Sequence, residues 1–77
     1  MMTRLPHILL VDDDREIRAL LSRYLAGQGY RTATAADGRE MREAMAGHVI
    51  DLIVLDLMLP GEDGLTLCRW VRAQSNV

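Results

Sequence analysis

The sequence predicts an α/β fold in which three strand-helix units lie on one parallel sheet. Strand-like segments alternate three times with segments of helical periodicity, which is the pattern of βα units. Two of these strand-like segments, residues 7–11 and 52–55, are almost continuously apolar, as in strands that are covered on both faces. Residues that favour helix caps and turns separate the strands from the helices. Together these features favour an open parallel sheet over a helical bundle or an all-β fold.

The first unit follows Pro6. His7–Val11 is apolar apart from its first residue and predicts a buried strand. Asp14 is suited to cap the next helix, and Gly27 or Gly29 is suited to end it. The apolar residues of this helix form an amphipathic stripe, which consists of Ile17, Leu20, Leu21, Tyr24 and Leu25.

The second unit is less apolar. Tyr30–Ala35 alternates in polarity and contains two threonines, which predicts a strand at the edge of the sheet. Asp37, followed three residues later by Glu40, resembles a capping box, so these two acids are interpreted as a helix start. The helix is expected to end at Gly47, and the residues filling the core from it are Met41, Ala44 and Met45.

The third unit begins with Leu52–Leu55, which predicts a strongly buried strand ending at Asp56. A loop with Pro60, Gly61 and Gly64 follows, and then a helix that starts near Asp63 and ends near Ser75 and Asn76. The spacing of Leu65, Cys68, Val71 and Arg72 predicts this helix, and Cys68 lies on its apolar stripe.

Other side chains of the third helix are given less specific roles. Cys68 is interpreted as a small core residue, since no second cysteine or neighbouring base suggests reactivity. Trp70 is expected on the outer side of the helix, partly exposed. Arg69 and Arg72 are expected to form a solvated face.

Composition excludes several classes of protein. The chain has 77 residues, 49% of them hydrophobic, which is enough for one small domain and too many for a disordered segment. A net charge of -2 and the absence of lysine leave no basic stripe for nucleic acid. The single cysteine, the lack of a signal-like apolar core and the lack of a membrane span predict a cytoplasmic location.

Three acidic residues follow the two apolar strands. Right-handed crossovers favour the strand order 2-1-3, which makes the carboxyl ends of the first and third strands neighbours. Asp12, Asp13 and Asp56 should therefore gather at one edge of the sheet. Carboxylates 4 Å apart repel by about 4 kcal/mol per pair at an effective dielectric constant of 20, so either protons or a cation should bind there. A cluster of oxygen ligands alone favours Mg²⁺, and Asp56 is the candidate nucleophile for phosphoryl transfer.

Two segments then resemble a known family. Residues 8–14, Ile-Leu-Leu-Val-Asp-Asp-Asp, resemble the opening of response-regulator receiver domains, and residues 54–65 resemble their phosphoacceptor segment in its OmpR-type form. The resemblance implies that Asp56 accepts a phosphoryl group from a sensor histidine kinase. It also implies that Asp13 and Asp56 bind Mg²⁺ directly, that Asp12 holds it through water, and that the backbone carbonyl of Met58 is a further ligand.

The resemblance covers the chain from about His7 onward. It implies the first three of the five βα units of a flavodoxin-like, CheY-like domain, so residues 1–77 are expected to be a truncated receiver without an effector domain. In the family, a Ser or Thr after the fourth strand and a Lys after the fifth assist phosphorylation and switching, and activity is expected to be weakened without them. The full-length protein would be a DNA-binding transcriptional regulator.

A second hypothesis is that the chain is a chemically inactive half-domain. In a sheet of order 2-1-3 the strongly apolar third strand lies at an edge, and its unpaired backbone groups could pair with a second copy. This hypothesis predicts a homodimer through that edge, with a mixed six-stranded sheet or a swapped arrangement. His7 and His48 lie at or before strand starts, so a structural role is expected for them.

Overall fold

The computed structural model describes residues 5–56 and 64–74 as three parallel strands and three helices. The strands are β1 (His7–Val11), β2 (Arg31–Ala35) and β3 (Leu52–Leu55). They alternate with the helices, which are α1 (Arg15–Gly27), α2 (Gly38–Gly47) and α3 (Gly64–Gln74). Both pairings of β1 are parallel and the sheet order is β2-β1-β3, so the predicted class and strand order are confirmed.

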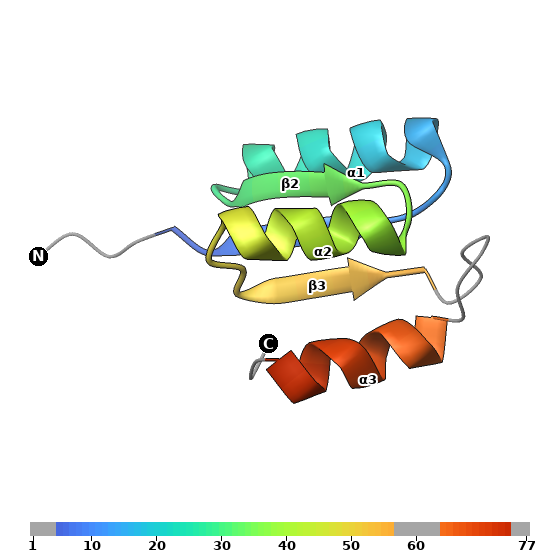
Figure 1. The fold of residues 1–77 in the computed structure, drawn as a ribbon. Coiled ribbons are helices and arrows are strands. Elements are labelled where there is room, and N and C mark those ends of the chain that lie inside the picture. The colour runs from blue at the N-terminus through green and yellow to red at the C-terminus, as the bar shows by residue number, and fades with distance from the viewer. Residues whose placement is uncertain (1–4, 57–63, 75–77) are drawn as a thin grey trace, which may run out of the picture.

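The helices lie on two faces of the sheet. The odd-numbered strand residues, such as Leu9 and Val11, share a core cluster with Met41 of α2 and Leu67 of α3. The even-numbered residues face α1, which contacts β1 and β2. In Figure 1, α2 crosses in front of the sheet, α1 lies behind it, and α3 flanks β3. Right-handed crossovers produce this arrangement. The chain adds β2 on one side of β1 and then β3 on the other side, so the two crossover helices lie on opposite faces of the sheet.

Two predicted helix boundaries are explained by their hydrogen bonds. Asp14 caps α1, and its side chain accepts hydrogen bonds from the backbone N–H groups of Glu16 and Ile17. At the other end, Gly29 has a φ of 93°, a left-handed conformation that favours glycine. The N–H groups of Gly29 and Tyr30 donate to the last carbonyls of the helix, as in a Schellman motif.

Asp37 and Glu40 begin α2 as predicted. The Asp37 carboxylate accepts a hydrogen bond from the Glu40 N–H at 2.9 Å, and the Glu40 carboxylate accepts one from the Ala36 N–H at 2.8 Å. The two acids therefore satisfy backbone donors that the helix leaves unpaired.

Replacing Asp37 with Ala should lower the free energy of unfolding by about 1 kcal/mol, because the Glu40 N–H loses its acceptor. Asp37→Asn keeps an acceptor oxygen and serves as the control, with an expected loss of only a few tenths of a kcal/mol. Urea unfolding followed by circular dichroism measures both variants. Equal losses in the two variants would contradict the capping role.

The prediction that β3 is strongly buried is wrong. None of its four residues is fully buried, and Leu52 and Val54 are 54% and 44% exposed. Their side chains lie on the same face of the sheet as α1. On that face, α1 packs mainly against β1 and β2 and leaves β3 largely uncovered. The apolar run thus predicted a strand correctly, but the described residues cover only one of its faces.

The stripe of α1 is also less buried than predicted. None of the 13 residues of α1 is fully buried, and Ile17, Leu20 and Tyr24 are exposed. The half-buried residues of α1 are Arg18, Leu21, Ser22 and Leu25, so two of the five residues of the predicted stripe are partly covered. The hydroxyl groups of Ser22 and Thr32, 2.7 Å apart, join α1 to β2. The apolar stripe of α1 therefore extends beyond the surface that the sheet covers.

The buried face of α3 differs from the predicted stripe. Leu67 and Val71 are buried, whereas Leu65 is exposed and Cys68 is half-buried. Trp70, expected on the outer side, is half-buried against the core and faces α2, with the guanidinium carbon of Arg42 5.2 Å from its ring centroid. Apolar residues occur on more than one side of α3, and packing against α2 decides which side is buried. Arg69 and Arg72 are exposed as predicted.

Candidate metal centre

The ends of β1 and β3 position the acidic residues through backbone hydrogen bonds. Asp12 directly follows β1, and its N–H donates to the Ala35 carbonyl of β2 at 3.1 Å. Asp56 directly follows β3, and its N–H donates to the Val11 carbonyl of β1 at 2.9 Å. Because each residue continues the hydrogen bonding of the sheet, the rigid strands determine where the two carboxylates lie.

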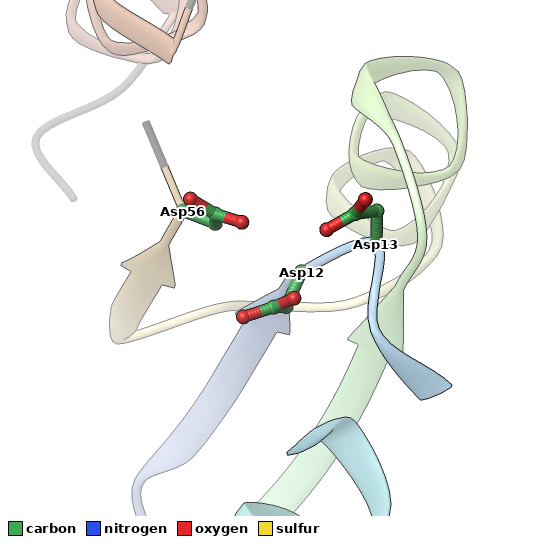
Figure 2. Close-up of side chains that lie close together, drawn as sticks. All are labelled: Asp12, Asp13 and Asp56. Carbon is green, nitrogen blue, oxygen red and sulfur yellow. The ribbon is translucent and has the colours of Figure 1, made fainter. Parts of the chain in front are cut away.

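The carboxylates of Asp12, Asp13 and Asp56 converge as predicted. One oxygen from each lies within 4.8 Å of the others. Figure 2 shows Asp13 and Asp56 pointing toward each other, with Asp12 between their backbones at the end of its strand. Asp12 and Asp56 are half-buried and Asp13 is exposed, so the cluster is anchored in the fold and remains open to solvent.

Neighbouring groups hold the loop that carries Asp12 and Asp13. The Asp12 carboxylate accepts a hydrogen bond from the Asp14 N–H at 2.9 Å. The Arg18 guanidinium of α1 donates to the Asp12 carbonyl oxygen at 2.7 Å. Asp14 also caps α1, so hydrogen bonds hold both ends of the loop between β1 and α1. These contacts restrict the loop without using the oxygens of Asp13.

Arg18 is a residue of this region that the sequence analysis did not identify. It lines an open cavity of about 280 Å³ together with Asp12 and Asp56, on the α1 side of the sheet. Arg18 lies one turn after the Asp14 cap on the side of α1 that faces the sheet. This position in the sequence could have indicated that its side chain reaches the end of β1. Arg18 brings a positive charge close to the acidic cluster.

The donor set fits a hard divalent cation. All three candidate ligands are carboxylates, with no histidine or thiol among them, and Mg²⁺ prefers oxygen ligands, of which one or two are typically protein carboxylates. Met58, the fourth predicted ligand, lies outside the described residues, as do Pro60 and Gly61 of the predicted loop. The described ligands leave room for water and for a phosphate oxygen.

The two histidines lie away from this site. His7 begins β1 and His48 follows α2, so both are at the amino-terminal end of the sheet, as predicted. His7 is buried, and the two rings meet edge to face with centroids 5.3 Å apart. Their placement agrees with the expected structural role.

The comparison with protein families decides the identity of the domain. The model of the response regulator receiver domain matches residues 8–77. The chain belongs to the response regulator receiver family. This receiver is similar to the transcriptional regulatory protein GltR of Pseudomonas aeruginosa, at 46% identity over 70 residues, and to the protein PetR of Rhodobacter capsulatus, at 45% over 69 residues. These matches cover 91% and 90% of the chain and 29% of each relative.

Solved structures show the same fold. The receiver is similar to the response regulator TrrA of Thermotoga maritima, crystallised with Mg²⁺ and a beryllium fluoride, with a TM-score of 0.86 and 35% identity. It is also similar to the receiver domain of the response regulator TorR, with a TM-score of 0.87 and 40% identity. The matches cover 92% and 94% of this chain and 62% and 60% of the other chains. The 77 residues thus span less than two thirds of these receivers.

In the described part of the receiver, no helix has the length and apolar character needed to cross a membrane.

Proposed function

We propose that this chain is a phosphoacceptor module in which Asp56 takes a phosphoryl group from a sensor histidine kinase in the presence of Mg²⁺. The convergence of three carboxylates at the adjacent ends of β1 and β3 carries the proposal. Membership of the receiver family supports it. Further support comes from TrrA, which has been crystallised both with Mg²⁺ and beryllium fluoride and with the histidine kinase ThkA.

In the proposed reaction, a carboxylate oxygen of Asp56 attacks the phosphorus of a phosphohistidine. The new O–P bond forms while the N–P bond breaks, and its electron pair leaves with the imidazole nitrogen, which then takes up a proton. When bound, Mg²⁺ supplies positive charge that neutralises the transferring phosphoryl group. Rigid anchoring of Asp56 to β1 keeps the nucleophile oriented, which lowers the entropic part of the barrier.

We assign different roles to the metal ligands. Asp13 and Asp56, which point toward each other, would bind the ion directly. Asp12, whose carboxylate already accepts the Asp14 N–H, would hold the ion through water. The carbonyl of Met58 would complete the protein ligands. This assignment leaves the remaining positions to water and to an oxygen of the phosphoryl group.

Binding of a phosphoryl mimic tests the proposal. Mg²⁺ and beryllofluoride together should raise the thermal unfolding midpoint of the chain, because a ligand that binds only the folded state stabilises it. The effect should vanish in Asp56→Asn and persist in Glu43→Gln, a carboxylate-to-amide change on the exposed side of α2. The absence of stabilisation, or its survival in Asp56→Asn, would refute the proposal.

We further propose that the full-length protein is a cytoplasmic, DNA-binding transcriptional regulator of the OmpR type. GltR and the similar protein AruR of Pseudomonas aeruginosa are both named transcriptional regulatory proteins. The 77 residues themselves carry a net charge of -2 and are not expected to bind DNA. A gel-shift assay on the purified chain checks this, and a complex at physiological salt would contradict it.

A second candidate function is self-association through the β3 edge without phosphoryl chemistry. The exposed Leu52 and Val54 and the edge position of β3 favour it. Two copies would pair antiparallel along β3. Because α3 flanks β3 in Figure 1, the α3 helices of both copies would have to be accommodated at the interface between the two β3 strands. Light scattering at micromolar concentration should then give a dimer mass, which Val54→Lys should reduce to a monomer. A wild-type monomer that unfolds cooperatively would exclude this function.

A further inference from the structure

A cluster of four titratable side chains lies at the amino-terminal end of the sheet, opposite the carboxylate site. His7 begins β1 and Arg31 begins β2, where the two residues are register partners. His48 follows α2, and Asp51 immediately precedes β3. One cluster therefore brings together the starts of all three strands.

His7 and Asp51 join β1 to β3 by a reciprocal pair of hydrogen bonds. The backbone N–H of His7 donates to the Asp51 carboxylate at 2.7 Å, and the backbone N–H of Asp51 donates to the His7 carbonyl oxygen at 2.9 Å. At the far end of β3, the Asp56 N–H donates to Val11 of β1. The four-residue strand is thus held to β1 at both ends, and the end at His7 holds the only histidine of the described residues that is fully buried.

The His7 ring is enclosed by groups from three elements. His7 is 8% exposed. Its ring contacts the His48 ring edge to face, with an interplanar angle of 74°. A hydrogen bond links the His7 ring to the backbone of Thr32 in β2. The Arg31 guanidinium approaches from β2, and the Asp51 carboxylate approaches from the segment before β3.

The surroundings of His7 favour its neutral form. Burial lowers the pKa of His7 from the ordinary value of 6.5, and the charges of Arg31 and His48 lower it further. The Thr32 hydrogen bond and the Asp51 carboxylate oppose this shift without cancelling it. A histidine with a lowered pKa in the folded state stabilises the fold above pH 6.5, and this contribution is lost as the pH falls through the folded-state pKa.

We propose that the His7, His48, Arg31 and Asp51 cluster is an acid-sensitive latch that releases the start of β3 when His7 takes up a proton. Protonation places a positive charge in a buried space beside the Arg31 guanidinium and the second imidazole. The His7 ring moves toward water to solvate the charge, and the reciprocal bonds between the His7 backbone and Asp51 then open. Without these two bonds, β3 is held to β1 only by the pairing of Leu52–Leu55 and by the Asp56 hydrogen bond.

Native-state hydrogen exchange at about pH 7.5 and about pH 5.5, on either side of the ordinary histidine pKa of about 6.5, tests the latch. After correction for the intrinsic exchange rate, protection of the Asp51 amide should fall on acidification by a larger factor than protection of the Leu25 amide in α1. In His48→Gln, which removes a neighbouring group that lowers the His7 pKa, the fall should shift to higher pH. In His7→Gln, protection of Asp51 should lose most of its dependence on pH.

If His7→Gln does not fold, NMR titration of the His7 imidazole in the wild type tests the proposal instead. A midpoint below the ordinary value, with chemical shift changes of Asp51 and Leu52 following the same curve, supports the latch. A midpoint at or above the ordinary value would overturn it. Equal pH dependence of Asp51 protection in the wild type and in a folded His7→Gln variant would overturn it as well.

Discussion

Asp56→Asn is expected to abolish covalent phosphorylation of the chain. Asp56 is the one carboxylate of the cluster that emerges from β3, and its N–H bond to Val11 holds it at the strand end. An amide of the same shape keeps the position but is not a competent nucleophile. Intact-mass spectrometry after incubation with Mg²⁺ and a small-molecule phosphodonor measures the effect. The wild type should gain the mass of one phosphoryl group and the variant should gain none.

Asp13→Asn is the matched comparison for this experiment. It removes a carboxylate from the same cluster and leaves the nucleophile in place. Phosphorylation should therefore persist but require a higher concentration of Mg²⁺. If Asp56→Asn were phosphorylated as fast as the wild type, the nucleophile would have been assigned to the wrong residue. If Asp13→Asn had an unchanged requirement for Mg²⁺, its role as a ligand would be wrong.

Leu9→Ala is expected to cost about 3–5 kcal/mol of folding free energy, as is typical of leucines replaced in a packed core. Leu9 is 0% exposed and lies in the central strand, where it packs with residues of α2 and α3. Because native domains are stable by only about 5–15 kcal/mol, and a chain of this size belongs toward the lower end, this loss would remove a large part of the folding free energy. Urea unfolding followed by circular dichroism measures the difference.

Leu20→Ala provides the control for the core prediction. Leu20 is 65% exposed on α1, so its truncation should change the free energy of unfolding by less than about 0.5 kcal/mol. A loss below about 1 kcal/mol in Leu9→Ala would contradict the core assigned around β1. A loss in Leu20→Ala as large as in Leu9→Ala would show that the stripe of α1 is covered in solution.

The sequence by itself determined the fold class, the strand order and the acidic site. Local chemistry alone identifies the strands and the helix starts, and any chain with this pattern shares it. The strands are the apolar segments 7–11 and 52–55, and the helix starts are the caps Asp14 and Asp37. The convergence of Asp12, Asp13 and Asp56 also followed from the sequence, because Asp12 and Asp56 directly follow strands that the crossover rule makes neighbours and Asp13 follows Asp12. Local pattern and handedness were sufficient for these features.

Only the tertiary structure decided which apolar surfaces are covered. The pattern of α3 allowed a stripe through Leu65 and Cys68, but packing against α2 buried Leu67 and turned Trp70 toward Arg42. The apolar run of β3 predicted burial on two faces, whereas α1 packs mainly against β1 and β2.

The pairing of His7 with Asp51 and the placement of Arg18 beside Asp12 were likewise decided by tertiary structure. Hydrophobic periodicity specifies that a side chain can be buried, but burial and partnership depend on which other element comes to lie against it. Residues distant in the sequence meet only when the sheet and its helices assemble.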